Sequence, residues 1–237
     1  MNKLQRLQKY LAYAGIASRR KCEILIQEKR VQVNRIVVTS LGTKIDPDKD
    51  EIRCDGEVVR PEKKIYILLN KPKGFVCSAR PQGGKNIFSL VKGISQRIYT
   101  VGRLDKDSEG LILLTNDGGF ADKCTHPKFG LTKTYRVAAS GEITANLKKA
   151  LSKGIYTSDG RITIENMRII KKHRDFTELE IVLREGKNRH IRRALEALKI
   201  DVKKLTRISL GNLHMGNLPK GSCRKLSERE IDSLLKE

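Results

Sequence analysis

The hydrophobic period of this chain changes near residue 30, and that change limits what the chain can fold into. Before it, apolar residues recur at the three- to four-residue spacing of a helix up to Gly15, which is expected to end that helix. Ser18 is a suitable cap for a second helix, with Cys22, Leu25 and Ile26 on its inner face. Beyond residue 30, apolar and polar residues alternate as they do in strands. We therefore predict two helices followed by β-structure.

Two hairpins and a linker are expected next. The stretches "VQVNRIVV" and "EIRCDGEVV" predict hairpins that turn at Asn34-Arg35 and Asp55-Gly56. Arg35 departs from the glycine that usually follows asparagine in such a turn. The residues after this region are polar and begin with a proline, which is typical of a linker. The expected organisation is a unit of residues 1–60, a linker of residues 61–64 and a larger domain of residues 65–237.

The larger domain mixes strands and helices without the regular alternation of a parallel sheet. Apolar runs such as "IYILLN" and "LILLT", and the alternating "FTELEIVL", predict strands, whereas "TANLKKALSKG" and "RHIRRALEALKI" predict helices. Ser227 and Glu230 have the spacing of a capping box, which predicts a last helix. These patterns indicate an α+β fold on a mixed, mainly antiparallel sheet.

Positive charge dominates the composition. The chain has 49 Lys and Arg against 27 Asp and Glu, a formal net charge of +22, and the 24 residues 184–207 alone carry nine basic and three acidic residues. Arg19, Arg20 and Lys21 fall in the first turn of the second predicted helix, where the helix dipole disfavours cations. Phosphate contact would explain cations at that place, and a solvated basic face is the alternative. We therefore expect a nucleic acid as partner.

Several other classes of protein are disfavoured. No run approaches the roughly 18 apolar residues of a membrane helix, and the first residues lack the apolar core of a signal peptide, so we expect a cytoplasmic protein. The five cysteines are scattered and form no C-x-x-C pair, which favours reduced thiols over disulfides or a zinc site.

The stretch "GRLDKDSEGLILLTNDG", which starts at Gly102, places Asp105, Asp107 and Glu109 at alternate positions before an apolar run. In a strand these carboxylates would share one face and could bind Mg²⁺, but the flanking glycines favour a turn. A second reading is one functional carboxylate at the mouth of a sheet, paired with an arginine of "GKNRHIRR". A third is a turn aspartate that bonds only its own backbone. The residues alone leave these readings open and favour the third.

Several separated motifs are similar to those of one enzyme family. Residues 3–60 resemble the S4-type (αL) RNA-binding module. Behind it, "NKPKG", "GRLDKDSEGLILLTNDG", "KTYRV", "EGKNRHIRR" and "GNLPKG" resemble the ribosomal RNA pseudouridine synthases that modify single uridines in small- and large-subunit rRNA. The resemblance covers essentially the whole chain. It implies a small S4-type RNA-binding module followed by a larger pseudouridine synthase catalytic domain.

The resemblance also implies three catalytic residues. Asp105 would be the nucleophile, and Tyr135 would stack on the target uracil and assist proton removal. Arg192 would pair with Asp105, although a phosphate contact is an alternative for this arginine.

Other residues would contact the substrate. Ile191 would pack beside the base, and Arg103 would help to hold the flipped nucleotide or its phosphate. His190 departs from the glutamine or glutamate that is usual at its position. Further RNA contacts are expected from Lys187, Arg189, Arg19, Arg20 and Lys21.

The implied reaction is the isomerisation of uridine, in which the N1–C1′ bond breaks and the base rejoins through C5. It has no redox or hydrolytic step, so the resemblance implies neither a cofactor nor a metal. The sequence leaves open whether the aspartate attacks C1′, adds to C6 or removes the C2′ proton. The 23S rRNA of the large subunit is the favoured target, and 16S rRNA is the alternative. From other classes, a non-catalytic rRNA-binding assembly factor and a metal-dependent nuclease using the three acidic residues are the competing hypotheses.

Overall fold

The computed structural model describes residues 4–78, 85–157 and 160–236, and the chain divides into two compact units. The smaller unit comprises the described residues of 1–65 together with 95–98 and 116–118. The larger unit comprises the described residues of 66–94, 99–115 and 119–237. No helix in the described part of the chain is long and apolar enough to span a membrane.

The smaller unit begins with two helices, as predicted. Helix α1 (Leu7–Tyr13) starts three residues later than the periodicity indicates, because strand β1 (Gln5–Arg6) pairs with β4 (Lys44–Ile45) instead of joining the helix. Helix α2 (Arg19–Gln27) is capped by Ser18, whose hydroxyl accepts the Lys21 backbone N–H at 3.2 Å. This cap confirms the prediction at Ser18.

Both predicted hairpins are present in the smaller unit. The sheet has the order β3-β2-β5-β6, with β2 at Val31–Val33, β3 at Ile36–Val37, β5 at Ile52–Cys54 and β6 at Glu57–Val58. Asn34 and Arg35 turn with φ of 50° and 68°, and Asp55 and Gly56 with φ of 52° and 83°. Two consecutive positive φ angles define the turn that suits a two-residue hairpin, and only one of the two turns has a glycine.

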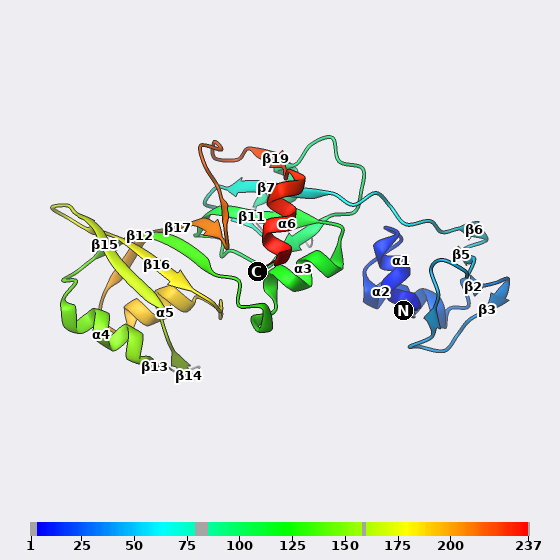
Figure 1. Cartoon of the computed structure of the whole chain (residues 1–237), viewed down its shortest axis with the longest axis horizontal. Helices are drawn as coiled ribbons and strands as arrows, with labels where there is room; N and C mark the ends of the chain where they lie inside the picture. The colour runs from blue at the N-terminus through cyan, green and yellow to red at the C-terminus, as the bar shows by residue number, and fades with distance from the viewer. Residues whose placement is uncertain (1–3, 79–84, 158–159, 237) are drawn as a thin grey trace. The chain divides into compact units, whose positions relative to one another are not determined.

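The larger unit is built on a nine-stranded sheet that confirms the predicted mixed, mainly antiparallel α+β fold (Figure 1). Its main path is β15-β16-β12-β17-β11-β7-β19, in which only the contact between β11 and β17 is parallel. Strand β10 (Tyr99–Val101) also pairs with β11, and β18 (Leu213–His214) with β17. The strands of the path are β15 (Asn166–Lys172), β16 (Thr177–Leu183), β12 (Lys133–Ser140), β17 (Asp201–Leu210), β11 (Glu109–Thr115), β7 (Tyr66–Lys71) and β19 (Cys223–Lys225).

Smaller elements complete this unit. Two short strand pairs lie outside the sheet, β8 with β9 and β13 with β14, and two 3₁₀ turns occupy residues 87–90 and 127–129. The helices are α3 (Gly118–Thr125), α4 (Ala145–Lys153), α5 (His190–Glu196) and α6 (Glu228–Lys236). The short strands are β8 (Phe75–Val76), β9 (Lys85–Asn86), β13 (Ile155–Thr157) and β14 (Gly160–Ile162).

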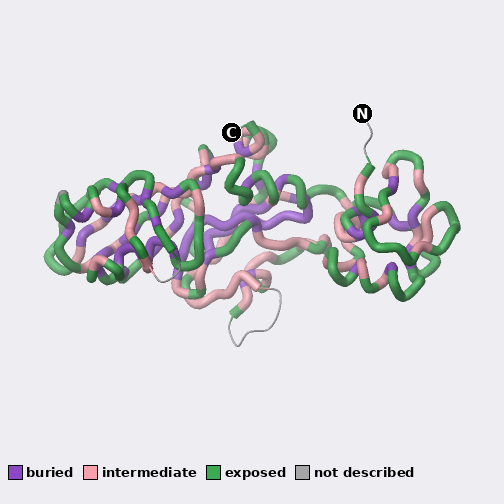
Figure 2. Tube along the Cα trace, turned by 90° about the horizontal axis from the view of Figure 1, so that it is seen from below, coloured by how far each residue is buried: buried purple, intermediate pink, exposed green. Residues whose placement is uncertain are grey.

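Helix α3 was not expected from the sequence, where "NDGG" indicates only a turn. Its two leading glycines are poor helix formers. Phe120 and Cys124, one helical turn apart, are buried in the core with Leu68 of β7 and Leu111 of β11. Tertiary packing therefore outweighs the weak local propensity. Figure 2 shows the buried residues concentrated in the strands through the middle of the larger unit, where all seven residues of β11 are buried.

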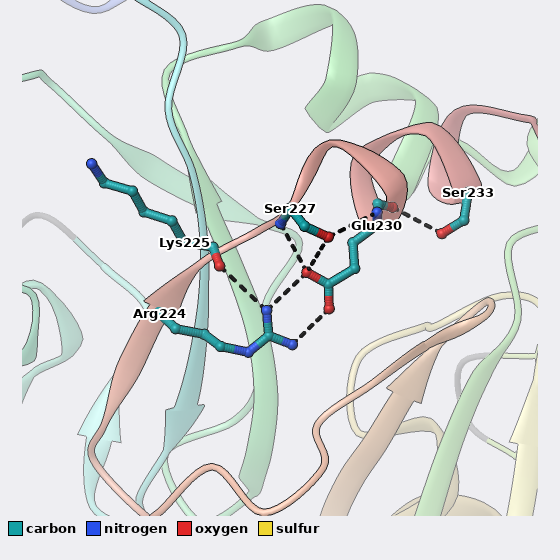
Figure 3. Close-up of polar contacts among 5 residues, drawn as sticks. All are labelled: Arg224, Lys225, Ser227, Glu230 and Ser233. Carbon is teal, nitrogen blue, oxygen red and sulfur yellow. Dashed lines mark hydrogen bonds and ion pairs between the residues drawn. The ribbon is translucent and has the colours of Figure 1, made fainter.

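The predicted capping box opens helix α6 (Figure 3). The Ser227 hydroxyl accepts the Glu230 backbone N–H at 3.3 Å, and the Glu230 carboxylate accepts the Ser227 backbone N–H at 2.9 Å. Arg224 adds two hydrogen bonds to the same carboxylate, at 2.6 and 2.8 Å. The guanidinium and the capping bonds together lower the pKa of Glu230 to about 2.

Candidate active site

A cavity of about 380 Å³ opens on the sheet of the larger unit. Its lining comes from the loop after β10, from β12 and β17, and from the loop that leads into α5. Six of the residues singled out in the sequence lie together here, namely Arg103, Asp105, Tyr135, Lys187, Arg189 and Ile191. These residues are up to 88 positions apart in the chain, so the fold is what assembles them.

Asp105 begins a tight turn at the edge of the cavity. The Ser108 backbone N–H donates to the Asp105 carbonyl at 3.1 Å, and β11 starts at the next residue. Within the described residues, the Asp105 carboxylate has no ion pair and no side-chain hydrogen bond. Its side chain is half-buried and lines the cavity. A carboxylate with free oxygens in such a place can act as a nucleophile or a base.

Lys71, at the end of β7, stabilises this turn through hydrogen bonds to its backbone carbonyls. Its side chain is fully buried, and its Nζ donates to the carbonyls of Asp105 at 2.9 Å and Ser108 at 2.6 Å. Burial lowers the pKa of Lys71, and the nearby Asp105, Asp107 and Glu109 oppose that shift. The motif "NKPKG" drew attention to this segment in the sequence, but nothing there indicated a contact with the acidic stretch.

Arg192 does not form the predicted pair with Asp105. Its guanidinium lies 3.2 Å from the Asp107 carboxylate and donates to the Asp107 carbonyl at 3.3 Å and the Val202 carbonyl at 3.1 Å. The turn between Asp105 and Ser108 is the physical reason, because it directs the carboxylate of Asp107, and not that of Asp105, toward α5. The prediction that Arg192 pairs with Asp105 was therefore wrong, because Arg192 pairs with Asp107 instead.

The three alternating carboxylates have three different surroundings. Asp105 lines the cavity, whereas Asp107 pairs with Arg192, and with Arg189 at 3.6 Å. Glu109 is buried and pairs with Lys220 at 3.0 Å. In the described ranges, no group of three or more His, Cys, Asp or Glu is placed to hold a metal ion. The arrangement is that of one open carboxylate beside two carboxylates that are held in ion pairs.

Tyr135 borders the cavity from β12 and is 8% exposed. Its cross-strand partners are Arg207 on β17 and Ile181 on β16. An aromatic ring in such a position can form a platform for a planar base. Ile191, at the start of α5, adds a buried apolar surface to the lining.

The loop before α5 is fastened by His190. Its Nδ1 accepts the Lys187 backbone N–H at 3.4 Å, so Nε2 carries the proton and donates to the Thr163 carbonyl at 2.9 Å. Burial lowers the pKa of His190, which keeps the imidazole neutral in this role. Arg189 has a φ of 48°, an uncommon angle for a residue with a side chain. The ring therefore fixes a loop that carries the exposed cations Lys187 and Arg189.

Gly110 allows the strand behind Asp105 to reach β17. A Cβ at this glycine would lie 2.2 Å from the carbonyl oxygen of Arg207 and 2.8 Å from its backbone nitrogen. Only glycine fits such a close backbone approach. Gly110, which follows the turn of Asp105, pairs with Arg207 on β17, and Arg207 in turn lies opposite Tyr135 on β12. This pairing fixes the position of the turn relative to Tyr135.

The remaining predicted RNA-binding residues belong to the smaller unit. Arg19, Arg20 and Lys21 are exposed in the first turn of α2. Such cations on a helix surface are available to a polyanion.

Comparisons with known proteins agree with this organisation. The family model for RNA pseudouridylate synthase matches residues 65–197, and the S4 domain model matches residues 5–52. An uncharacterized RNA pseudouridine synthase of Aquifex aeolicus (strain VF5) is 41% identical over 98% of this chain and 94% of its own length. The ribosomal large subunit pseudouridine synthase B of Bacillus subtilis (strain 168) is 39% identical over 98% of this chain and 96% of its own length. A crystal structure of pseudouridylate synthase matches with a TM-score of 0.69 at 28% identity and covers 97% of this chain and 99% of that one.

These matches confirm the resemblance that the sequence motifs indicated. Both the order of the two domains and the coverage of the whole chain agree with it. The chain therefore belongs to the RNA pseudouridine synthase family of isomerases, with an S4 domain ahead of its catalytic domain.

Proposed function

We propose that this chain converts a specific uridine of 23S rRNA to pseudouridine, in the cytoplasm and without a cofactor or a metal. Relatives named as large-subunit enzymes support this target: besides the Bacillus protein, the ribosomal large subunit pseudouridine synthase B of Pseudomonas aeruginosa is 34% identical over 98% of this chain and 62% of its own length. The S4 domain and the net charge of +22 support an RNA substrate. We also propose that residues 1–60 form the RNA-binding domain, residues 61–64 the linker and residues 65–237 the catalytic domain.

The observation that carries the proposal is the open carboxylate of Asp105 beside Tyr135 in one cavity. In the proposed reaction Asp105 acts as the nucleophile toward the target nucleotide. The N1–C1′ bond breaks, a C5–C1′ bond forms, C5 loses its proton and N1 gains one. The atoms of substrate and product are the same, so the reaction needs no oxidant, reductant or second substrate.

The walls of the cavity suit a base that has left the RNA stack. Extrusion of a nucleotide costs a few kcal/mol, and stacking on an aromatic ring recovers about 1–3 kcal/mol per base. Tyr135 would supply this platform, and Ile191 would pack against the base. The exposed Arg103, Lys187 and Arg189 would contact the neighbouring phosphates.

Arg192 is a positioning residue in this proposal. Its bonds go to the carboxylate and carbonyl of Asp107, two residues beyond the nucleophile. Together with the bonds of Lys71 to Asp105 and Ser108, they fix the turn from two sides. A reacting group held in one geometry gains rate because little ordering is left for the transition state.

The test is the release of tritium from rRNA labelled at uridine C5, with 23S and 16S transcripts in separate reactions. We expect release from 23S rRNA alone, with the same rate in the presence of a chelator. Asp105→Asn should abolish it, while Asp122→Asn, which changes an exposed carboxylate on α3, should not. Release by Asp105→Asn at the unaltered rate would contradict the nucleophile assignment. Release from 16S rRNA alone would contradict the target.

A further inference from the structure

Two cations of the cavity have no role in the reaction described so far. Lys133 and Arg207 both line the cavity that contains Asp105 and Tyr135. Arg207 is 4% exposed, whereas Lys133 is half-buried. A cation inside the protein is costly to bury, so its presence in a cavity calls for a physical reason.

Both cations flank Tyr135. Lys133 precedes it by two positions on β12, so the two side chains leave the same face of the strand. Arg207 is the residue opposite Tyr135 on β17, beside a shift in the register of the two strands, and both residues line the same cavity. A base stacked on Tyr135 would therefore lie within reach of Arg207.

Both cationic groups donate hydrogen bonds to uncharged backbone carbonyls. The Nε of Arg207 donates to the Leu111 carbonyl at 2.7 Å, and the Nζ of Lys133 donates to the carbonyls of Leu131 and Arg184, each at 3.1 Å. In the part of the chain that the structure describes, neither cation pairs with a carboxylate. Arg207 therefore keeps most of its five N–H donors for another ligand. Burial and the charge of Arg207 lower the pKa of Lys133, as expected for cations that lack a counter-ion.

We propose that Arg207, assisted by Lys133, forms a subsite for the ring oxygens of uracil and stabilises the negative charge that the ring carries when the N1–C1′ bond breaks. This inference rests on the proposed function. If Asp105 attacks C1′, the bonding pair leaves with N1 and spreads over O2 and O4, while C1′ becomes esterified to the aspartate. Attack of C5 on C1′ then releases the carboxylate, C5 loses its proton and N1 gains one.

The charge argument does not depend on that route. If Asp105 adds to C6, the ring becomes an enolate before the bond to C1′ breaks. If the C2′ proton is removed, the base again departs as an anion. Each route places negative charge on ring oxygens, and a fixed donor at such a place lowers the barrier because it needs no reorganisation.

The position of Arg207 favours the base over a phosphate as its ligand. Three exposed cations, Arg103, Lys187 and Arg189, are already available to phosphates around the cavity. Arg207 instead lies among buried apolar residues of the lining, including Leu205 and Leu210. A flat ring with two carbonyl oxygens fits such surroundings better than a hydrated phosphate.

The test compares Arg207→Met with Arg136→Met, which removes an exposed cation from the opposite face of β12, next to Tyr135. Tritium release from saturating 23S rRNA, RNA affinity and thermal unfolding are measured for each. We expect Arg207→Met to lower the rate by about 100-fold or more with an RNA affinity within about 3-fold of the unaltered protein. Arg136→Met should leave both quantities unchanged.

Two further variants keep the test decisive if Arg207→Met fails to fold. Arg207→Lys keeps the charge and should retain more activity than Arg207→Met, and Lys133→Gln should lower the saturated rate by about 10-fold. Weaker RNA binding with an unchanged saturated rate in these variants would identify a phosphate contact and overturn the inference. Unchanged rates would also overturn it. If the unaltered protein releases no tritium, the proposed function itself fails, which is a different result.

Discussion

The three basic residues in the first turn of α2 and the two buried cations near Asp105, Lys71 and Arg207, have opposite surroundings. Arg19, Arg20 and Lys21 are exposed on α2, and within the described residues none of their side chains is ion-paired. Lys71 and Arg207 are buried, and each donates to specific backbone carbonyls of the strands and turns around Asp105. In the proposed function, the exposed group would attract RNA in a way that depends on salt, whereas the buried group would fix the geometry of the site and its local electrostatic field.

If the proposed function holds, this difference separates the residues that bind RNA from those that serve the reaction. Exposed cations release counter-ions from RNA and need no particular orientation. Buried cations cost free energy that only well-placed partners offset, so they are expected where a fixed charge is useful. Substitutions in the two sets should therefore change different measured quantities.

Among the changes discussed next, the largest effect is expected for Lys71→Met. The carbonyls of Asp105 and Ser108 would lose their donor in a buried place, which costs about 1–3 kcal/mol of the free energy of unfolding. The turn of Asp105 would loosen, and a displacement of about 1 Å at a reacting group can lower the rate about 100-fold. Tritium release and denaturant unfolding measure the two effects. Lys123→Met, an exposed change on α3, is the control; full activity in Lys71→Met would remove Lys71 from the positioning network.

Much of the fold follows from local patterns, because periodicity and caps act within a few residues. Ser18 and Glu230 were predicted as capping residues and are found in those roles. Helix α3 was missed, since Phe120 and Cys124 stabilise it through contacts with strands distant in the sequence. Local signals therefore predict elements that stabilise themselves, and they miss elements that depend on packing.

Some residues of the candidate site were likewise predicted from the sequence, and others were found only in the structure. The resemblance located Asp105 and Tyr135, which the fold places in one cavity. Lys71 and Arg207 escaped notice because their partners, the Asp105 and Leu111 carbonyls, carry no sequence signal. The predicted partner of Arg192 was wrong because the turn at Asp105 decides which carboxylate faces α5.

The next effect, on RNA binding, is expected for the exposed cations of α2. Replacing Arg19, Arg20 and Lys21 together with alanine should weaken RNA binding and reduce the slope of log affinity against log salt by up to about 3, roughly one per lost phosphate contact. The saturated rate of tritium release and the stability should be unchanged, because these side chains are exposed. Binding measured at several salt concentrations checks the slope. A fall in the saturated rate would show that the two sets of cations do not act separately.

A smaller effect, on the free energy of unfolding, is expected when the ion pair between Glu230 and the half-exposed Arg224 is removed. The pKa of Glu230 is lowered from its ordinary value of 4.5 to about 2, so the ion pair stabilises the fold above about pH 4.5 and loses its contribution as the pH falls toward 2. Because both side chains are partly exposed, solvent screening limits the gain to about 1 kcal/mol. The free energies of unfolding of the unaltered protein and of Glu230→Gln, compared from pH 6 to pH 3, should differ less and less as the pH falls. A constant difference would contradict the titration of this carboxylate.

The smallest effect is expected at Arg35, a cation of the smaller unit that the backbone itself disfavours. Its φ of 68° costs a side chain about 1 kcal/mol, while Gly56 in the equivalent turn, at φ of 83°, bears no such strain. Arg35→Gly should therefore raise the free energy of unfolding by roughly 0.5–1 kcal/mol, less the entropy that glycine returns to the unfolded chain. Gly56→Arg, the reciprocal change, should lower it by a similar amount. If Arg35→Gly also weakens RNA binding at low salt, Arg35 belongs with the exposed cations of α2, and its strained turn is retained for that contact. If binding is unchanged, only the turn geometry is affected, and exposure of a cation alone does not make it part of the RNA-binding surface.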